Sequence, residues 1–148
     1  MPLPHLTSES IVLGAAAGDW REAVREVGAA LARSGATRPA YADEMVRMIE
    51  EHGPYVVIAP GLALAHARPG PEVLADGLAV VTLSTPVYFG HPHNDPVSVV
   101  LGLAVASPEG HLAFVAELAN VFNDARAIPA LAAATSTEEV QTIMGGTS

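Results

Sequence analysis

The residue best suited to covalent chemistry is His66, which follows a short apolar segment and precedes Arg68 and a turn rich in Pro and Gly. Neutral imidazole is a nucleophile near neutral pH, because its reference pKa is about 6.5 and a large fraction is unprotonated. The apolar neighbours and the turn would fix the backbone and leave the ring exposed. A histidine that only completes a turn is the alternative interpretation of the same pattern.

Residue types missing from the chain narrow the chemistry further. All 7 basic residues are Arg, and there is no Cys. Without Lys the protein cannot form a Schiff base, a Ser-Lys dyad or a Walker-type phosphate lysine. Without Cys it has no thiol nucleophile, disulfide or thiolate-bound metal. A nucleophile must therefore be a His, Ser, Thr, Tyr or carboxylate side chain.

The charge balance indicates which partners suit the protein. Its 16 acidic and 7 basic residues leave a formal net charge of −9, which argues against nucleic acid and anionic membrane surfaces. The amino terminus shows no signal peptide, and the longest apolar run, residues 97–106, is about half the length of a membrane helix. We therefore expect a cytoplasmic protein that does not insert into a membrane. The apolar share of 50% suffices for a core and leaves room for a homodimer.

Apolar periodicity, caps and breakers predict an α/β fold, with helices packed against a small mixed sheet. The chain shows no internal repeat or linker, so we expect a single domain over residues 1–148. The predicted helices are 19–34, 37–51, 108–123, 124–133 and 137–144. The predicted strands are 55–59, 77–83 with an extension to 89, and 97–106.

Residues 53–69, Gly-Pro-Tyr-Val-Val-Ile-Ala-Pro-Gly-Leu-Ala-Leu-Ala-His-Ala-Arg-Pro, resemble the active-site segment of the enzyme IIA component of the sugar phosphotransferase system. The similarity is to the mannitol/fructose superfamily, and within it to the ascorbate-type branch. Residues 94–97, Asn-Asp-Pro-Val, and 110–112, Gly-His-Leu, match later landmarks of that family in the right order. The resemblance therefore spans nearly the whole chain, which makes it more specific than one short motif.

The resemblance implies a mixed sheet of about five strands and a protein-to-protein phosphotransferase in which His66 is phosphorylated. The donor would be the histidine-phosphocarrier protein HPr. The acceptor would be a cognate enzyme IIB, which serves a membrane permease, IIC. Transfer between histidines needs placement and charge compensation but no metal and no cofactor. The sugar cannot be deduced, because the permease selects it.

The resemblance also implies that His111 stands beside His66, and local sequence supports this pairing. His111 lies in the first turn of a helix that Ser107, Pro108 and Glu109 are well suited to open. Free N–H groups and the helix dipole at such an end favour an anion. A phosphoryl group on His66 could accept hydrogen bonds from His111 and from those amides. A water-exposed residue of the first turn is the alternative.

Two departures from the family pattern concern the active site. Ala65 stands where much of the superfamily has Pro before the active histidine. In the mannitol-like branch an Arg lies on the preceding helix, and a gapless count from His66 places Glu50 at the equivalent position. Arg68 could supply the missing positive charge, as could Arg47, although a solvated turn arginine is an equal interpretation of Arg68.

Other candidate residues are ambiguous. Asp95 could orient an active-site imidazole and set its tautomer, or it could organise a turn, because Asn-Asp-Pro favours turns. His91 and His93 flank a Pro in a loop and suggest a metal, but two ligands do not make a site. His5 and His52 carry no functional signal.

Two other function classes remain open on sequence alone. A zinc hydrolase could use His66, His91, His93 and His111, since catalytic zinc takes three protein ligands, but no HExxH-like spacing supports it. A regulatory module with the same fold would be phosphorylated on His66 and control a partner instead of feeding uptake.

Overall fold

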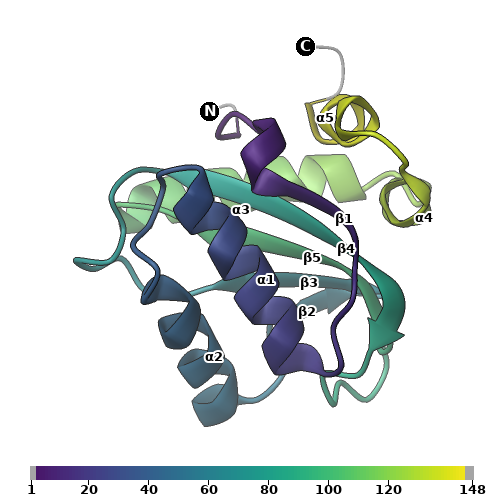
Figure 1. The fold of residues 1–148 in the computed structure, drawn as a ribbon, viewed down its shortest axis with the longest axis horizontal. Helices are drawn as coiled ribbons and strands as arrows, with labels where there is room; N and C mark the ends of the chain where they lie inside the picture. The colour runs from purple at the N-terminus through teal and green to yellow at the C-terminus, as the bar shows by residue number, and fades with distance from the viewer. Residues whose placement is uncertain (1–2, 146–148) are drawn as a thin grey trace.

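The computed structural model describes residues 3–145, and its centre is a five-stranded mixed sheet with helices on both faces (Figure 1). The strand order is β1-β4-β5-β3-β2, which confirms the predicted fold class. The strands are β1 (Ile11–Ala15), β2 (Val57–Ala59), β3 (Leu62–His66), β4 (Gly77–Val87) and β5 (Val97–Ala104). The helices are η1 (Ser8–Ser10), α1 (Trp20–Arg33), α2 (Tyr41–His52), α3 (Pro108–Phe122), α4 (Ala127–Ala133) and α5 (Thr137–Gly145).

The pairing of β3 with β5 determines where the candidate site lies. These two strands are parallel, and His66, the last residue of β3, is opposite Leu103 of β5. β4 pairs with β5 in the antiparallel sense, and β1 pairs with β4 in the parallel sense. The carboxyl ends of β3 and β5 therefore meet at one edge of the sheet, which is where ligands bind in open α/β sheets.

Two apolar layers cover the sheet. Helices α1 and α2 lie in front of it in Figure 1, and α3 lies behind it. Val24, Val27 and Leu31 of α1 are fully buried in the first layer, and Leu118 and Leu131 are buried in the second. Burial of one such side chain contributes about 1.5–3 kcal/mol, so both helical layers hold the sheet in place.

A close approach of α1 and α2 depends on one glycine. A Cβ on Gly28 would lie 2.5 Å from the Cβ of Ala42, closer than two side chains can come. The missing side chain lets α2 pack tightly against α1. The position of α2 matters for function, because this helix supplies one wall of the candidate site.

Three predicted helix ends agree with the structure, whereas the helix predicted from residue 37 begins at Tyr41, because Thr37 forms a β-bridge with Val73. The Asp19 carboxylate caps α1 by accepting a hydrogen bond from the N–H of Glu22 at 2.9 Å. The Ser107 hydroxyl caps α3 by accepting from Gly110 at 3.1 Å. Gly53, with φ of +83°, ends α2 in a conformation that favours glycine.

The sequence prediction missed β1 and β3. Leu62–His66 consists of leucine and alanine before the histidine, residues that favour helix and do not alternate in polarity. The strand forms because it is hydrogen-bonded between β5 and β2 and is covered on both faces. The helix predicted from residue 124 begins later, at Ala127, after a turn in which the Asp124 side chain accepts a hydrogen bond from the N–H of Arg126.

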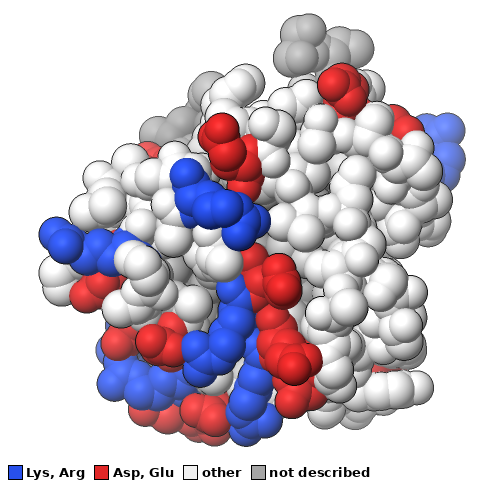
Figure 2. Space-filling view, in the orientation of Figure 1, with Lys and Arg blue, Asp and Glu red and all other residues white. Residues whose placement is uncertain are grey.

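Charged side chains gather over α1 and α2, whereas the right-hand part of the same face is mostly uncharged (Figure 2). Arg21 pairs with Glu50 at 3.1 Å, and Arg25 pairs with Asp43 at 2.5 Å. Such exposed pairs contribute about 0–1 kcal/mol each. Among residues 3–145 no helix is long and apolar enough to cross a membrane.

Candidate active site

His66 and His111 lie side by side at the carboxyl edge of β3 and β5. Their ring centroids are 5.0 Å apart, with an angle of 43° between the ring planes. His66 ends β3, and His111 projects from the first turn of α3, which follows β5 after a short connection. The sheet register and the Ser107 cap thus determine the separation of the two rings.

The His66 ring is held in one tautomer by its own strand. Its Nδ1 lies 3.0 Å from the carbonyl oxygen of Leu64. A carbonyl can only accept, so Nδ1 carries the proton and Nε2 keeps its lone pair. Burial lowers the pKa of His66 below its ordinary value, and a charge on His111 acts in the same direction, while the Leu64 bond opposes them. The ring is therefore a neutral base with a free nitrogen.

The lowered pKa of His66 leads to a prediction for its titration. The neutral form should dominate further into the acidic range than for a free histidine, so the NMR titration midpoint of His66 should lie below 6.5. Because protonated His111 disfavours a second charge, His111→Ala should move this midpoint upward. A midpoint at or above 6.5 in the unmodified protein would contradict the burial argument.

The two histidines open into a pocket of about 590 Å³. Its lining is mostly apolar and comprises Met48, His52, Tyr55, His66, Ala67, Arg68, Pro69, Pro108, His111 and Leu112. Tyr55 stands edge-on to His66, with ring centroids 5.6 Å apart and an interplanar angle of 89°. Leu112 at the rim is 71% exposed. A small, largely apolar cleft around one nucleophilic nitrogen suits a group passed between proteins.

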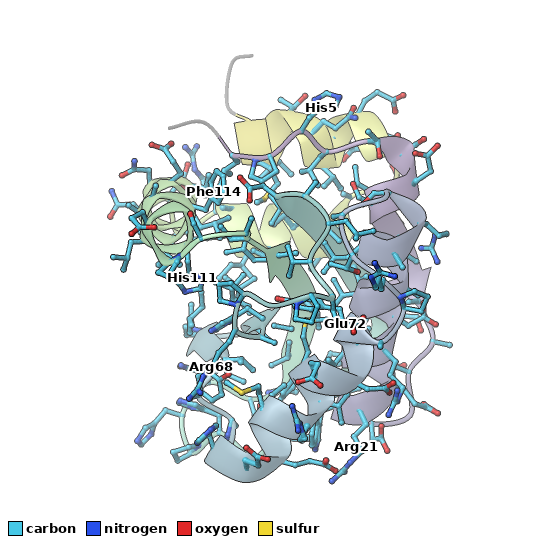
Figure 3. The ribbon with its side chains drawn as sticks, turned by 90° about the vertical axis from the view of Figure 1, so that its left-hand side faces the viewer. His5, Arg21, Arg68, Glu72, His111 and Phe114 are labelled. Atoms are coloured by element: carbon cyan, nitrogen blue, oxygen red, sulfur yellow. The ribbon has the colours of Figure 1, made fainter. Side chains whose placement is uncertain are left out.

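Arg68 is the arginine that lines this pocket. It lies on the same side of the molecule as His111 (Figure 3), and it has no ion pair within residues 3–145. Burial raises the pKa of the Tyr55 hydroxyl in the same pocket, and the charge of Arg68 opposes that rise. Arg68 is thus a cation that lines the same pocket as His66.

The other two residues considered for this charge are engaged elsewhere. Arg47 pairs with Glu44 on the same helix. Glu50 pairs with Arg21 of α1. Neither Arg47 nor Glu50 lines the pocket.

The backbone at the start of α3 offers less to an anion than the sequence suggested. Gly110 donates its N–H to the Ser107 hydroxyl, and His111 donates its N–H to the Ser107 carbonyl at 3.1 Å. Pro108 has no N–H. The N–H groups of Gly110 and His111 are thus already used by Ser107, so that of the amides expected to assist a phosphoryl group only the N–H of Glu109 is left in this turn. The His111 imidazole is the side-chain donor that this helix brings to the pocket.

Asp95 organises a loop, and its carboxylate does not contact an imidazole. It accepts hydrogen bonds from the backbone N–H groups of Phe89, Gly90 and His91, at 3.1, 2.7 and 2.9 Å. The turn interpretation therefore describes its contacts, and the Leu64 carbonyl takes the orienting part considered for Asp95.

The remaining histidines do not form a zinc site. His91 Nδ1 accepts hydrogen bonds from the N–H groups of His93 and Asn94, both at 3.1 Å, so this nitrogen stabilises a turn. Within the described part of the chain, no three His, Asp or Glu residues are grouped so that they could hold a metal ion. A zinc hydrolase built on His66, His91, His93 and His111 has no geometric basis here.

Sequence reasoning missed several residues around the cleft. His52 and Met48 project into it from the last turns of α2, and Tyr55 follows the Gly53 that ends this helix. Their spacing of four residues on one helix face was a usable signal, since Met48 and His52 must point the same way. What could not be read from the sequence is that this face meets the end of β3.

Comparison with known proteins gives one consistent result. Residues 4–145 match the family described as "Phosphoenolpyruvate-dependent sugar phosphotransferase system, EIIA 2". The ascorbate-specific PTS system EIIA component of Escherichia coli K12 is 35% identical over 134 residues, which cover 90% of this chain and 87% of that protein.

Solved structures agree with this match. The complex of enzyme IIAMTL and phosphorylated enzyme IIBMTL from Escherichia coli contains a chain with a TM-score of 0.86 and 27% identity, covering 97% of this chain and 99% of that one. The nitrogen regulatory protein IIA-Ntr from Neisseria meningitidis has a TM-score of 0.78 and 28% identity, with coverage of 92% and 93%.

Proposed function

Since this chain belongs to the EIIA 2 family of the phosphoenolpyruvate-dependent sugar phosphotransferase system, we propose that His66 is the residue that carries the phosphoryl group. The protein is an EIIA phosphocarrier that passes the group on to an enzyme IIB. The observation that supports His66 is its place on the wall of the pocket, with Nδ1 bonded to the Leu64 carbonyl so that the lone pair is on Nε2.

In the proposed reaction HPr is the donor. The lone pair on Nε2 of His66 attacks phosphorus, the new N–P bond forms as the donor's N–P bond breaks, and the electron pair of that bond returns to the donor. No proton has to move on His66 during this step, because Nδ1 already holds one. The group then leaves His66 for a nucleophile of enzyme IIB by the reverse displacement.

Charge on the three phosphoryl oxygens is compensated by two side chains. His111 faces His66 across 5.0 Å between ring centroids, so a protonated ring nitrogen can donate a hydrogen bond to an oxygen. Arg68 supplies a full positive charge and a planar set of donors that suits phosphate. Because Arg68 lines the cleft and Arg47 is paired away from it, we assign this role to Arg68.

Arg68→Gln should slow phosphorylation of His66 about tenfold, because one charge-assisted hydrogen bond to the transferring group is lost. The matched control is Arg47→Gln, which removes the same charge from the surface of α2 and should leave the rate unchanged. The initial rate of labelling at fixed donor concentration measures both. Equal labelling rates in Arg68→Gln and Arg47→Gln would contradict the proposed role of Arg68 in phosphoryl transfer.

The apolar rim supports docking of phosphotransferase partners over the cleft. Leu112 and Tyr55 are 71% and 40% exposed, and Pro69 and Pro108 also line the pocket. Transient interfaces of this kind bury less than about 1,200 Å². HPr and enzyme IIB would use this one surface in turn, because both must reach the same nitrogen.

The ascorbate-specific relative favours sugar uptake of the ascorbate type, with an enzyme IIB that serves a membrane permease. The similarity to a nitrogen regulatory protein keeps a second candidate, a regulatory phosphohistidine module of the same fold. Genes for a IIB and a permease beside this one would favour transport.

The test of the proposed function is direct labelling. The protein is incubated with phosphoenolpyruvate, enzyme I and HPr, and mass spectrometry should find one acid-labile phosphoryl group on the peptide that contains His66. Nitrogen NMR should place it on Nε2. Labelling elsewhere, or none with an active donor system, would overturn the proposal.

A further inference from the structure

Tyr41 forms a buried polar contact directly behind the candidate site. It is the first residue of α2 and is 1% exposed. Its hydroxyl accepts a hydrogen bond from the N–H of Ala67 at 2.9 Å and lies 3.0 Å from the carbonyl oxygen of Leu103, to which it donates. The Ala67 carbonyl is a more distant second acceptor at 3.3 Å.

These two backbone groups belong to the segments that carry the two histidines. Ala67 directly follows His66, at the point where β3 ends. Leu103 is the register partner of His66 on β5, and β5 leads through Ser107 into α3 and His111. One hydroxyl therefore joins the two segments at the position where their parallel pairing ends and the chains separate.

We propose that Tyr41 is a positioning residue for phosphoryl transfer, whose hydroxyl links the end of β3 to β5 and thereby aims the His66 ring at His111. This inference rests on the proposed function of His66. Tyr41 does not line the pocket, so its effect passes through the backbone on either side of the site.

The hydroxyl is well suited to this task. Burial raises the pKa of Tyr41 to about 12, so the group keeps its proton over the working pH range and can donate and accept at once. The N–H of Ala67 is partly buried and the C=O of Leu103 is buried, and loss of the hydroxyl would take a hydrogen bond away from each of them. The ring is rigid and comes from α2, which is packed closely on α1.

Position matters here because in-line transfer is sensitive to small displacements. A shift of about 1 Å at the reacting group can cost about a hundredfold in rate. If the backbone at Ala67 moves, the His66 ring also loses its alignment with the Leu64 carbonyl two residues earlier. The fraction of His66 with the proton on Nδ1 should then fall.

Tyr41→Phe removes the hydroxyl and keeps the ring, and it should slow phosphorylation of His66 about tenfold. The nitrogen NMR signals of His66 should move toward those of a mixture of tautomers. The matched control is Thr82→Val, which removes a hydrogen bond at 2.9 Å from the N–H of Gly14 to a buried hydroxyl on β4, toward the far edge of the sheet. This control should keep both the rate and the His66 signals.

Both variants are compared at a temperature at which circular dichroism shows each to be fully folded, so that loss of stability does not enter the rate. Should Tyr41→Phe fail to fold, a tyrosine fluorinated beside the hydroxyl replaces Tyr41. The fluorinated hydroxyl keeps its contacts but accepts the hydrogen bond from Ala67 more weakly. The labelling rate and the His66 signals should therefore change in the same direction as in Tyr41→Phe, by a smaller amount.

The outcomes separate the two proposals. A normal rate with unchanged His66 signals in Tyr41→Phe would overturn the positioning role, as would an equal loss in Thr82→Val. Failure of the unmodified protein to become labelled would overturn the proposed function instead. The His66 nitrogen signals still decide the role of Tyr41 in that case, because they are measured without phosphorylation.

Discussion

His66→Ala is expected to abolish phosphorylation, with no label detectable under conditions that saturate the unmodified protein. The nitrogen that forms the bond to phosphorus is removed, and within residues 3–145 no other histidine combines a free Nε2, a fixed tautomer and a place at the end of β3 beside β5. His111 remains in the pocket, but it has no equivalent of the Leu64 carbonyl to hold a proton on its far nitrogen.

The control for this variant is His52→Ala. His52 lines the same pocket on an exposed turn of α2, so its removal changes the size of the cleft and takes away one imidazole without touching the proposed nucleophile. It should accept label at close to the normal rate. A labelled His66→Ala protein would show that another residue carries the group.

His111→Ala is expected to slow transfer to and from His66 by about a hundredfold, the range seen when one preorganised donor to a developing charge is removed. The reason is that the ring of His111 is the side-chain donor that α3 brings to the pocket, while Ser107 already uses the N–H groups of Gly110 and His111 in the same turn. The labelled residue should still be His66.

His111→Gln serves as the companion variant, since its amide can donate a hydrogen bond but carries no charge. Its rate should lie between those of the unmodified protein and His111→Ala. Labelling by phosphorylated HPr, quenched at fixed times, measures transfer to His66. Subsequent transfer of the label to enzyme IIB measures transfer from His66. Full activity in His111→Ala would mean that Arg68 alone compensates the phosphoryl charge.

The fold was predictable where local chemistry decides the structure. The caps at Asp19 and Ser107 and the stop at Gly53 mark helix ends, and β-branched residues mark β5. Strand β3 was not predictable, because Leu62–Ala65 would suit a helix equally well. Its conformation is decided by pairing with β5, which is a contact between residues far apart in the chain.

In the candidate site, too, some residues could be predicted from local sequence and others only from long-range contacts. His66 and His111 could be singled out from their neighbours and from a family resemblance, and the competing uses of Arg47 and Arg68 could only be stated as alternatives. The structure separates them, since one arginine faces an acidic neighbour on its own helix and the other faces the cleft. Tyr41 could not be singled out from the sequence, because no local pattern indicates which backbone groups a buried hydroxyl will meet.

The bond between His66 and the Leu64 carbonyl has a consequence for the return half of the cycle. A phosphorylated ring that keeps its Nδ1 proton is cationic, and it departs from phosphorus as neutral imidazole instead of as an anion. The Leu64 carbonyl, which keeps Nε2 of unphosphorylated His66 free to attack, thus also makes the imidazole of phosphorylated His66 a good leaving group. Phosphorylation and dephosphorylation of His66 then have comparable barriers. The direction of phosphoryl transfer is determined by the concentrations of phosphorylated donor and unphosphorylated acceptor.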